Sequence, residues 1–356
     1  MERRARTTRL KTNTSRVIRA NTNLSEKRVE QTEKETRPGR QPVVRASRLN
    51  TIRFDASLPF PCFSGNRSHQ DKDICMRIAT RQHIITTSHG SLAVEESGEG
   101  GMPVLLVHGN SSCRGVFRHQ LLGRLAGRYR LIAFDLPGHG ESSDAPDPMR
   151  SYTRPGLADA SVELLEKLGV TECVVFGWSL GGHIGIDMLS RFPGMRGLMI
   201  SGTPAVGFDN MAEGFRGSPH SGVAGRRDLS DADIDGFIQG IFGESAEPFL
   251  RDAVARTDGR FRQRLFAAAR AGEGGDQRVA VAGSHIPLAV VNGGADRLVN
   301  LDYVDSVAYG NLWERRCHRL PGLGHASFWE APGDFDPVLE RFLQDVEGGR
   351  ATTRAL

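Results

Sequence analysis

The chain has 356 residues, of which 38% are hydrophobic and 25% charged, and its formal net charge is +4. This length and composition predict a folded globular protein of roughly two domains and exclude a fibrous or wholly disordered chain. Its longest apolar runs, such as VLLV and LAVV, are far shorter than the roughly 18 to 20 residues that cross a bilayer, so we expect no membrane-spanning segment.

Residues 1–75 differ in charge from the rest of the chain. They hold 17 of the 46 Lys and Arg residues and 8 of the 42 Asp and Glu residues, which leaves 29 basic against 34 acidic residues in the remainder. This leader has no hydrophobic period, so we predict that it is disordered. A basic arm could bind nucleic acid, but an upstream extension of a reading frame that starts at Met76 is an alternative, and we expect no nucleic-acid partner.

Cofactor and metal motifs are missing from the sequence. The five cysteines are widely spaced and form no C-x-x-C pair: Cys62, Cys75, Cys113, Cys173 and Cys317. Neither a disulfide scaffold nor a cysteine zinc site is indicated, and no H-E-x-x-H, G-x-x-x-x-G-K-[ST] or strand-linked G-x-G-x-x-G motif occurs. We therefore predict no cofactor and no metal, and a cytoplasmic location in the absence of a secretory signal.

From His83 onward, short apolar strands alternate with helical stretches. HIITTS and SLAVEE predict a hairpin around Gly90, and further strands are predicted at 103–109, 130–138, 172–179, 196–202, 286–294 and 316–320. Helical patterns lie at 157–169, 180–192 and 335–346. Near-continuous apolar strands that alternate with helices indicate a mostly parallel sheet covered on both faces, so the predicted fold class is α/β.

The interval 203–284 interrupts this alternation. It contains amphipathic stretches but no clear strand, and Ser230 is placed to cap the first of them, SDADIDGFIQGIFG. We predict a helical cap inserted between two parts of the core, 76–202 and 285–356. Long insertions of this kind often carry substrate contacts.

The motif Gly177-Trp178-Ser179-Leu180-Gly181 is a G-x-S-x-G that follows an apolar strand and precedes a helix. In this context the motif is typical of a sharp strand-to-helix turn that exposes a nucleophilic serine, and neighbouring glycines leave room for the strained backbone. G-x-S-x-G also occurs by chance in ordinary turns. The flanking strand and helix favour Ser179 as the nucleophile.

A serine nucleophile needs a base, and the base needs an acid that orients it. Downstream of Ser179, Asp296 follows the predicted strand 286–294, and His325 lies in a glycine-rich loop after the last strand. Because loops at the carboxyl ends of parallel strands meet at one edge of the sheet, we predict a Ser179, His325 and Asp296 triad. Asp302 and Asp305 follow closely enough to leave the choice of acid open.

Acyl transfer also needs hydrogen-bond donors for the oxyanion. The backbone N–H groups of Leu180, next to the nucleophile, and of Asn110, after the strand 103–109, are our candidates. The predicted substrate contacts are Trp178, Phe237 and Phe328, and further aromatic side chains at Phe242, Phe249 and Trp329 could roof the pocket. For all of these aromatic residues except Trp178, ordinary core packing is an alternative.

Several segments together resemble the α/β-hydrolases: HGNSS, FDLPGHGESSD, VVFGWSLGGHIGI, RGLMISGTP, VVNGGAD and GHASFWEAP. Their wording is similar to the metal-independent N-acyl-homoserine-lactone lactonases of this fold, over about residues 83–346. The resemblance implies that Ser179, Asp296 and His325 occupy the triad positions, and Asn110 and Leu180 the oxyanion positions. It also implies an acyl ester or lactone as the small-molecule substrate; the oligomeric state stays open.

Two departures from this family concern the triad acid and the cap. The acid in the family is a glutamate where this chain has Asp296, and a cap tyrosine that contacts substrate corresponds to Phe237. A general carboxylesterase or C–C bond hydrolase is therefore an alternative function. A ligand-binding homologue without catalysis is a second alternative, although such proteins usually lose a triad member.

Overall fold

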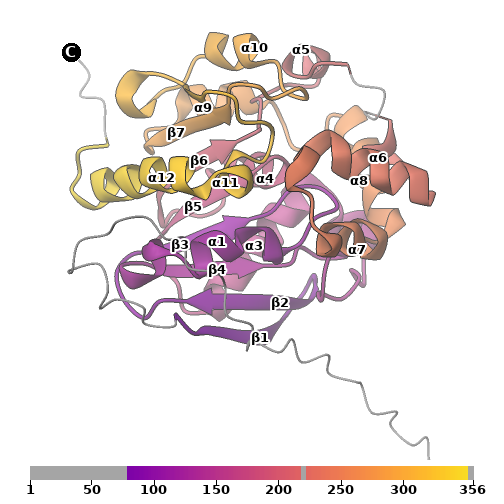
Figure 1. Ribbon diagram of the computed structural model, residues 1–356, viewed down its shortest axis with the longest axis horizontal. Coiled ribbons are helices and arrows are strands. Elements are labelled where there is room, and N and C mark those ends of the chain that lie inside the picture. The colour runs from indigo at the N-terminus through magenta and orange to yellow at the C-terminus, as the bar shows by residue number, and fades with distance from the viewer. Residues whose placement is uncertain (1–77, 218–221, 352–356) are drawn as a thin grey trace, which may run out of the picture. The chain divides into compact units, whose positions relative to one another are not determined.

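The computed structural model describes residues 78–217 and 222–351, which belong to one compact unit (Figure 1). The predicted leader 1–75 lies outside the described residues. In chain order the strands are β1 (Thr80–Thr87), β2 (Gly90–Ser97), β3 (Pro103–Val107), β4 (Arg130–Phe134), β5 (Cys173–Trp178), β6 (Met195–Ser201), β7 (Leu288–Gly293) and β8 (His318–Leu320).

Helices connect these strands. In chain order the α-helices are α1 (Arg118–Leu121), α2 (Pro148–Ser151), α3 (Arg154–Lys167), α4 (Leu180–Met188), α5 (Met211–Gly214), α6 (Asp231–Phe242), α7 (Pro248–Arg256), α8 (Gly259–Arg270), α9 (Gln277–Gly283), α10 (Leu301–Ser306), α11 (Ser327–Glu330) and α12 (Pro332–Glu347). Short 3-10 turns are η2 (Arg114–Phe117), η3 (Arg124–Gly127), η4 (Val223–Gly225), η5 (Gly243–Ser245) and η6 (Trp313–Arg315).

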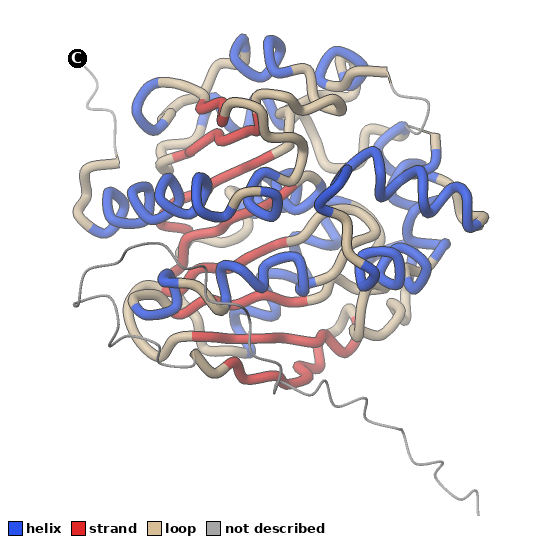
Figure 2. Tube along the Cα trace, viewed as in Figure 1, coloured by secondary structure: helices blue, strands red, loops and turns tan. Residues whose placement is uncertain are grey.

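The eight strands form one sheet in the order β1-β2-β4-β3-β5-β6-β7-β8. β2 pairs antiparallel with β1 and β4, and the other neighbours are parallel. The predicted hairpin is confirmed, because Thr87 lies opposite Gly90. Every predicted strand is present, so the predicted fold class, a mostly parallel α/β sheet flanked by helices, is confirmed (Figure 2).

Both faces of the sheet are buried. In β5, Cys173 and Val175 pack into one hydrophobic cluster with α3 and α4, whereas Val174 and Phe176 pack into a second cluster with α1 and α12. All four side chains are fully buried. Burial on both faces explains why this strand is a continuous apolar run rather than an alternating one.

The segment between β6 and β7 holds five helices, α5 to α9, and no strand among its described residues. The prediction that Ser230 is the N-cap residue of α6 is confirmed. The Ser230 hydroxyl accepts the Asp233 N–H at 3.2 Å, and the Asp233 carboxylate accepts the Ser230 N–H at 3.1 Å. Helices α6, α7 and α8 lie together at the right of Figure 1. The limits of the inserted helical cap, 203–284, stay a prediction. Its last helix, α9, packs on α4 of the core, where Gln277 donates to Asp187 at 2.8 Å.

Two features predicted as absent can be examined in the described ranges. No helix there is long and apolar enough to cross a membrane, and no group of three or more His, Cys, Asp or Glu side chains there could hold a metal ion. Cys113, Cys173 and Cys317 are free thiols, whereas Cys62 and Cys75 lie outside the described residues.

Candidate active site

Ser179 lies at the turn from β5 into α4, with φ 55° and ψ −118°. A non-glycine residue at this φ is strained, and its neighbours must be small. A Cβ at Gly177 would lie 2.3 Å from the Gly181 carbonyl oxygen, and a Cβ at Gly181 would lie 1.9 Å from the Val107 carbonyl oxygen. Gly177 is therefore required by the tightness of the turn itself, and Gly181 by the close packing of the turn against β3.

The backbone of Ser179 is held on both sides by the last residue of β6 and by the segment that follows it. Its N–H donates to the Ser201 carbonyl at 2.8 Å, and the Thr203 hydroxyl donates to the Ser179 carbonyl at 2.8 Å. The side chain is half-buried at the N-terminus of α4. These two hydrogen bonds hold Ser179 in its strained conformation. Strained residues at functional sites usually persist because the surrounding structure holds them in this way.

His325 and Asp296 come together although 29 residues separate them. His325 Nδ1 lies 2.8 Å from Asp296 Oδ2, and the two residues are 5% and 2% exposed. The carboxylate also accepts the N–H groups of Leu298 and Val299 at 2.8 and 3.1 Å. Burial by itself raises the pKa of Asp296, but His325 and these N–H groups outweigh it, so the net pKa is lowered. The acid is therefore held ionised, and the bond at Nδ1 leaves Nε2 of the imidazole for another partner.

The other two candidate acids lie elsewhere. Asp302 and Asp305 both bind the Arg319 guanidinium, at 2.8 and 2.5 Å, and the Asp302 side chain is 82% exposed. Neither has a hydrogen bond to His325 within residues 78–217 and 222–351.

The loop of His325 is tied to the turn of Ser179. Trp178 Nε1 donates to the His325 carbonyl at 2.9 Å, and the two rings lie 5.7 Å apart. No hydrogen bond joins the Ser179 hydroxyl to His325 in the described part of the chain. Catalytic hydrogen bonds are often long without substrate and tighten when it binds, so the bond between Ser179 and His325 stays a prediction.

Gly202 sets the position of the imidazole. It follows Ser201 with φ +63°, and a Cβ there would lie 2.7 Å from His325 Cε1 and 3.0 Å from Nδ1. Its N–H donates to the Asn292 side chain at 2.8 Å. Only glycine fits between the end of β6 and the ring.

Gly202→Ala is therefore expected to lower kcat for ester hydrolysis by about 10- to 100-fold, because it displaces the imidazole by a fraction of an ångström or more. Steady-state kinetics on a p-nitrophenyl ester would measure this. The matched control is Gly169→Ala, which has φ +66° but no atom within 4 Å of the added Cβ. Both variants are strained by about 1 kcal/mol; equal kcat values in the two would contradict the positioning role.

The two candidate oxyanion donors lie beside Ser179. A Cβ at Gly109 would lie 3.2 Å from Ser179 Cβ, which shows how closely the turn after β3 approaches the nucleophile. The Asn110 and Leu180 N–H groups have no hydrogen-bond partner among the described residues. Leu180 is the first residue of α4, where backbone N–H groups are left free by helix geometry. Such groups can stabilise a developing negative charge.

The three aromatic side chains predicted to contact substrate are all mostly buried. Phe328 is fully buried and stacks on Phe117 with ring centroids 5.2 Å apart, which favours a structural role over the predicted contact. Trp178 is 1% exposed and packs on Phe242 of α6. Phe237, also on α6, is 9% exposed. Contact of Trp178 and Phe237 with substrate stays a prediction.

One residue that holds the His325 loop was missed by the sequence analysis. The Glu330 carboxylate accepts the N–H groups of Gly324 and Ala326, at 2.7 and 3.2 Å, and so binds the backbone on both sides of His325. The only signal for it in the sequence is an acid five residues after the histidine. The sequence alone does not show that this acid binds the loop, because the contacts form only where the loop folds back on α11.

Other histidines near the site already form hydrogen bonds within the protein. His108 Nδ1 lies 2.8 Å from the Gly109 carbonyl, and its Nε2 accepts the Leu136 N–H at 3.0 Å. Burial lowers the pKa of His108, so it stays neutral. His183 Nδ1 lies 2.6 Å from Oε1 of the Gln277 side chain. Neither is available as the base.

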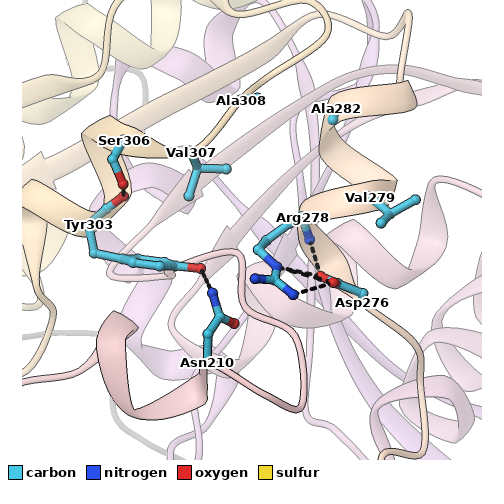
Figure 3. A pocket seen from close by; sticks show the side chains of 9 residues that line it. All are labelled: Asn210, Asp276, Arg278, Val279, Ala282, Tyr303, Ser306, Val307 and Ala308. Carbon is cyan, nitrogen blue, oxygen red and sulfur yellow. Dashed lines mark hydrogen bonds and ion pairs between the residues drawn. The ribbon is translucent and has the colours of Figure 1, made fainter. Parts of the chain in front are cut away.

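A separate surface pocket of about 490 Å³ lies between α9 and α10 (Figure 3). Its polar groups are bonded to one another: Asn210 Nδ2 donates to the Tyr303 hydroxyl at 2.8 Å, and Arg278 pairs with Asp276 at 2.6 Å. Neither Ser179 nor His325 lines it, so it is not the candidate active site.

Residues 104–337 match the alpha/beta hydrolase family, and the chain belongs to that family. The resemblance to its N-acyl homoserine lactonases is confirmed by a solved structure, the lactonase AidH complexed with N-butanoyl homoserine. This chain is 48% identical to it, and the alignment covers 75% of this chain and 97% of that one with a TM-score of 0.74.

Curated relatives include esterases. The pimeloyl-[acyl-carrier protein] methyl ester esterase of Yersinia pseudotuberculosis is 27% identical over 70% of this chain and 95% of its own length. The esterase of the same description from Nitrosospira multiformis is 39% identical, but the match spans only 29% of this chain and 38% of that protein.

Proposed function

We propose that this protein is a serine hydrolase that opens the lactone ring of N-acyl homoserine lactones. Ser179 is the nucleophile, His325 the general base and acid, and Asp296 the residue that orients His325. The observation that carries this proposal is the buried pair of His325 and Asp296, 2.8 Å apart, tied through Trp178 to the strained turn of Ser179.

The reaction has two halves. In the first, His325 Nε2 takes the Ser179 proton as the serine oxygen attacks the lactone carbonyl, and the Asn110 and Leu180 N–H groups bind the oxyanion. The ring C–O bond then breaks, and His325 returns the proton to the departing ring oxygen. In the second half, His325 activates a water that hydrolyses the acyl-serine ester and frees Ser179.

A lactone sets one requirement that an open-chain ester does not. The alcohol released from the ring stays attached to the acyl group, so it competes with water for the acyl-enzyme with a large effective molarity. Deacylation therefore depends on a water held at His325. The charge on Asp296 favours the protonated imidazole that forms in each half of the reaction.

The second candidate function is hydrolysis of an open-chain ester, as in a carboxylesterase. It is favoured by the match to a methyl ester esterase over 95% of that protein's length. Phe237 also favours it, because a phenylalanine lacks the hydroxyl that a tyrosine could offer to a lactone or amide group.

The experiment that separates the two is proton release from a medium-chain N-acyl homoserine lactone, compared with p-nitrophenyl butyrate under the same conditions. We expect the lactone to be opened with kcat/KM of at least about 10⁴ M⁻¹s⁻¹. Spontaneous opening without enzyme is subtracted. Cleavage of the p-nitrophenyl ester alone would overturn the lactonase proposal in favour of the esterase.

A further inference from the structure

A ring of hydrogen bonds, closed by the backbone of residues 224–227, joins the turn after β3 to the cap. Asn110 Nδ2 donates to the Ala224 carbonyl at 3.1 Å, and the Ser111 hydroxyl donates to Asn110 Oδ1 at 2.9 Å. Arg262 on α8 donates from Nη1 to the Ser111 hydroxyl at 3.2 Å. The same guanidinium donates to the carbonyls of residues 226–227, at 2.9 and 3.2 Å, just after Ala224.

Arg262 is an unusual residue to find at this place. It is 4% exposed, and none of the acidic side chains in the described ranges forms an ion pair with it. Burial lowers the pKa of its guanidinium. A buried cation without an ion-pair partner costs stability compared with an apolar side chain of similar size. What an apolar residue cannot supply is the planar fork of donors that reaches the turn and the cap at once.

The turn after β3 is strained at Ser111, the residue that the ring of hydrogen bonds reaches. Ser111 has φ 55°, which costs a non-glycine residue roughly 1 to 2 kcal/mol. Its N–H donates to His139 Nε2 at 3.3 Å, and the His139 ring packs edge-on against Phe261 with centroids 4.3 Å apart. Two consecutive residues of α8, Phe261 and Arg262, therefore hold Ser111, one through its backbone and one through its hydroxyl.

We propose that Arg262 is a positioning residue for the oxyanion site. Through Ser111 it holds the Asn110 side chain, and thereby the orientation of the Asn110 N–H beside Ser179. It also fixes the cap segment whose Ala224 carbonyl accepts the Asn110 side-chain NH₂ group. The cap and the oxyanion donor are thus coupled. This inference rests on the proposed function in one respect, the role of the Asn110 N–H as a donor.

The kinetic test compares Ser111→Ala, Arg262→Gln and the double variant on p-nitrophenyl butyrate. Each single variant is expected to lower kcat by about 10- to 100-fold with KM changed less than about threefold, because the donor acts on the transition state. The double variant should lose little more than Arg262→Gln alone, since both changes break one link. The pH profile should not move, because His325 is untouched.

The matched control is Arg260→Gln on the same helix, whose half-exposed guanidinium pairs with the half-exposed Asp144 and with the largely buried side chain of Asp258. It should leave kcat unchanged. Ser111→Ala removes only a hydroxyl, so it keeps the test decisive if Arg262→Gln does not fold. Parent-like kcat in a folded Ser111→Ala variant would overturn the proposal.

A second readout does not depend on activity. Hydrogen exchange of the Ser111 amide is expected to rise about tenfold in Arg262→Gln and Ser111→Ala, and not in Arg260→Gln, because opening of the turn becomes easier. If the parent hydrolyses neither the lactone nor the p-nitrophenyl ester, the proposed function fails, and the exchange alone then decides whether the ring of hydrogen bonds holds the turn. Unchanged hydrogen exchange of the Ser111 amide would overturn the inference. Raised exchange with unchanged kcat would show that the hydrogen bonds stabilise the turn without positioning the oxyanion donor, which also overturns the proposal.

Discussion

Ser179→Ala is expected to lower kcat for lactone and ester hydrolysis by about 10⁴- to 10⁶-fold. On the proposed mechanism the variant removes the atom that forms the acyl-enzyme, and what remains is the rate that binding and the oxyanion donors give to direct attack by water. The strained φ of 55° is imposed by the turn, so alanine should adopt the same backbone and the fold should persist.

The measurement is initial-rate kinetics with both substrates, together with labelling by a fluorophosphonate probe. The parent protein should be labelled at one site, and Ser179→Ala should not be labelled. Ser190→Ala, an exposed serine just after α4, is the matched control and should behave as the parent does. Residual activity above about 1% in Ser179→Ala would show that another group is the nucleophile.

Asp296→Asn is expected to lower kcat by about 10³- to 10⁴-fold. The carboxylate lies 2.8 Å from His325 Nδ1 and favours a proton there, which on the proposed mechanism leaves Nε2 free to accept the proton of Ser179. An amide can turn its NH₂ group toward the ring and favour the wrong tautomer, and it no longer favours the charged imidazole. The loss should appear in kcat and in kcat/KM, with little change in KM.

The chain provides controls for this variant in its two neighbouring acids. Asp302→Asn and Asp305→Asn lose only an ion pair with Arg319 at the surface and should keep kcat within about twofold of the parent. Asp296→Glu keeps the charge, and we expect it to recover part of the activity that Asp296→Asn loses. If Asp305→Asn is the variant that loses activity, the assignment of the acid is wrong.

The sequence by itself determined the sheet and the turn of the candidate nucleophile. Segments such as CVVF are apolar at every position, and only a strand buried on both faces needs that pattern. Gly177 is a local requirement of the tight turn, because an added Cβ would meet the Gly181 carbonyl, so the turn could be predicted around Ser179 from its nearest neighbours. The capping box of Ser230 and Asp233 is likewise a contact three residues apart.

Only the tertiary structure decided which distant residues meet. The sequence favoured Asp296 but left Asp302 and Asp305 as alternatives, and the choice depends on where the loop after β7 lies relative to the loop of His325. The fit of Gly202 against the imidazole and the bonds from Arg262 to Ser111 also join segments far apart in the chain. Such contacts leave no periodic or local signal, because each depends on the packing of whole elements, and so no reading of neighbouring residues could have found them.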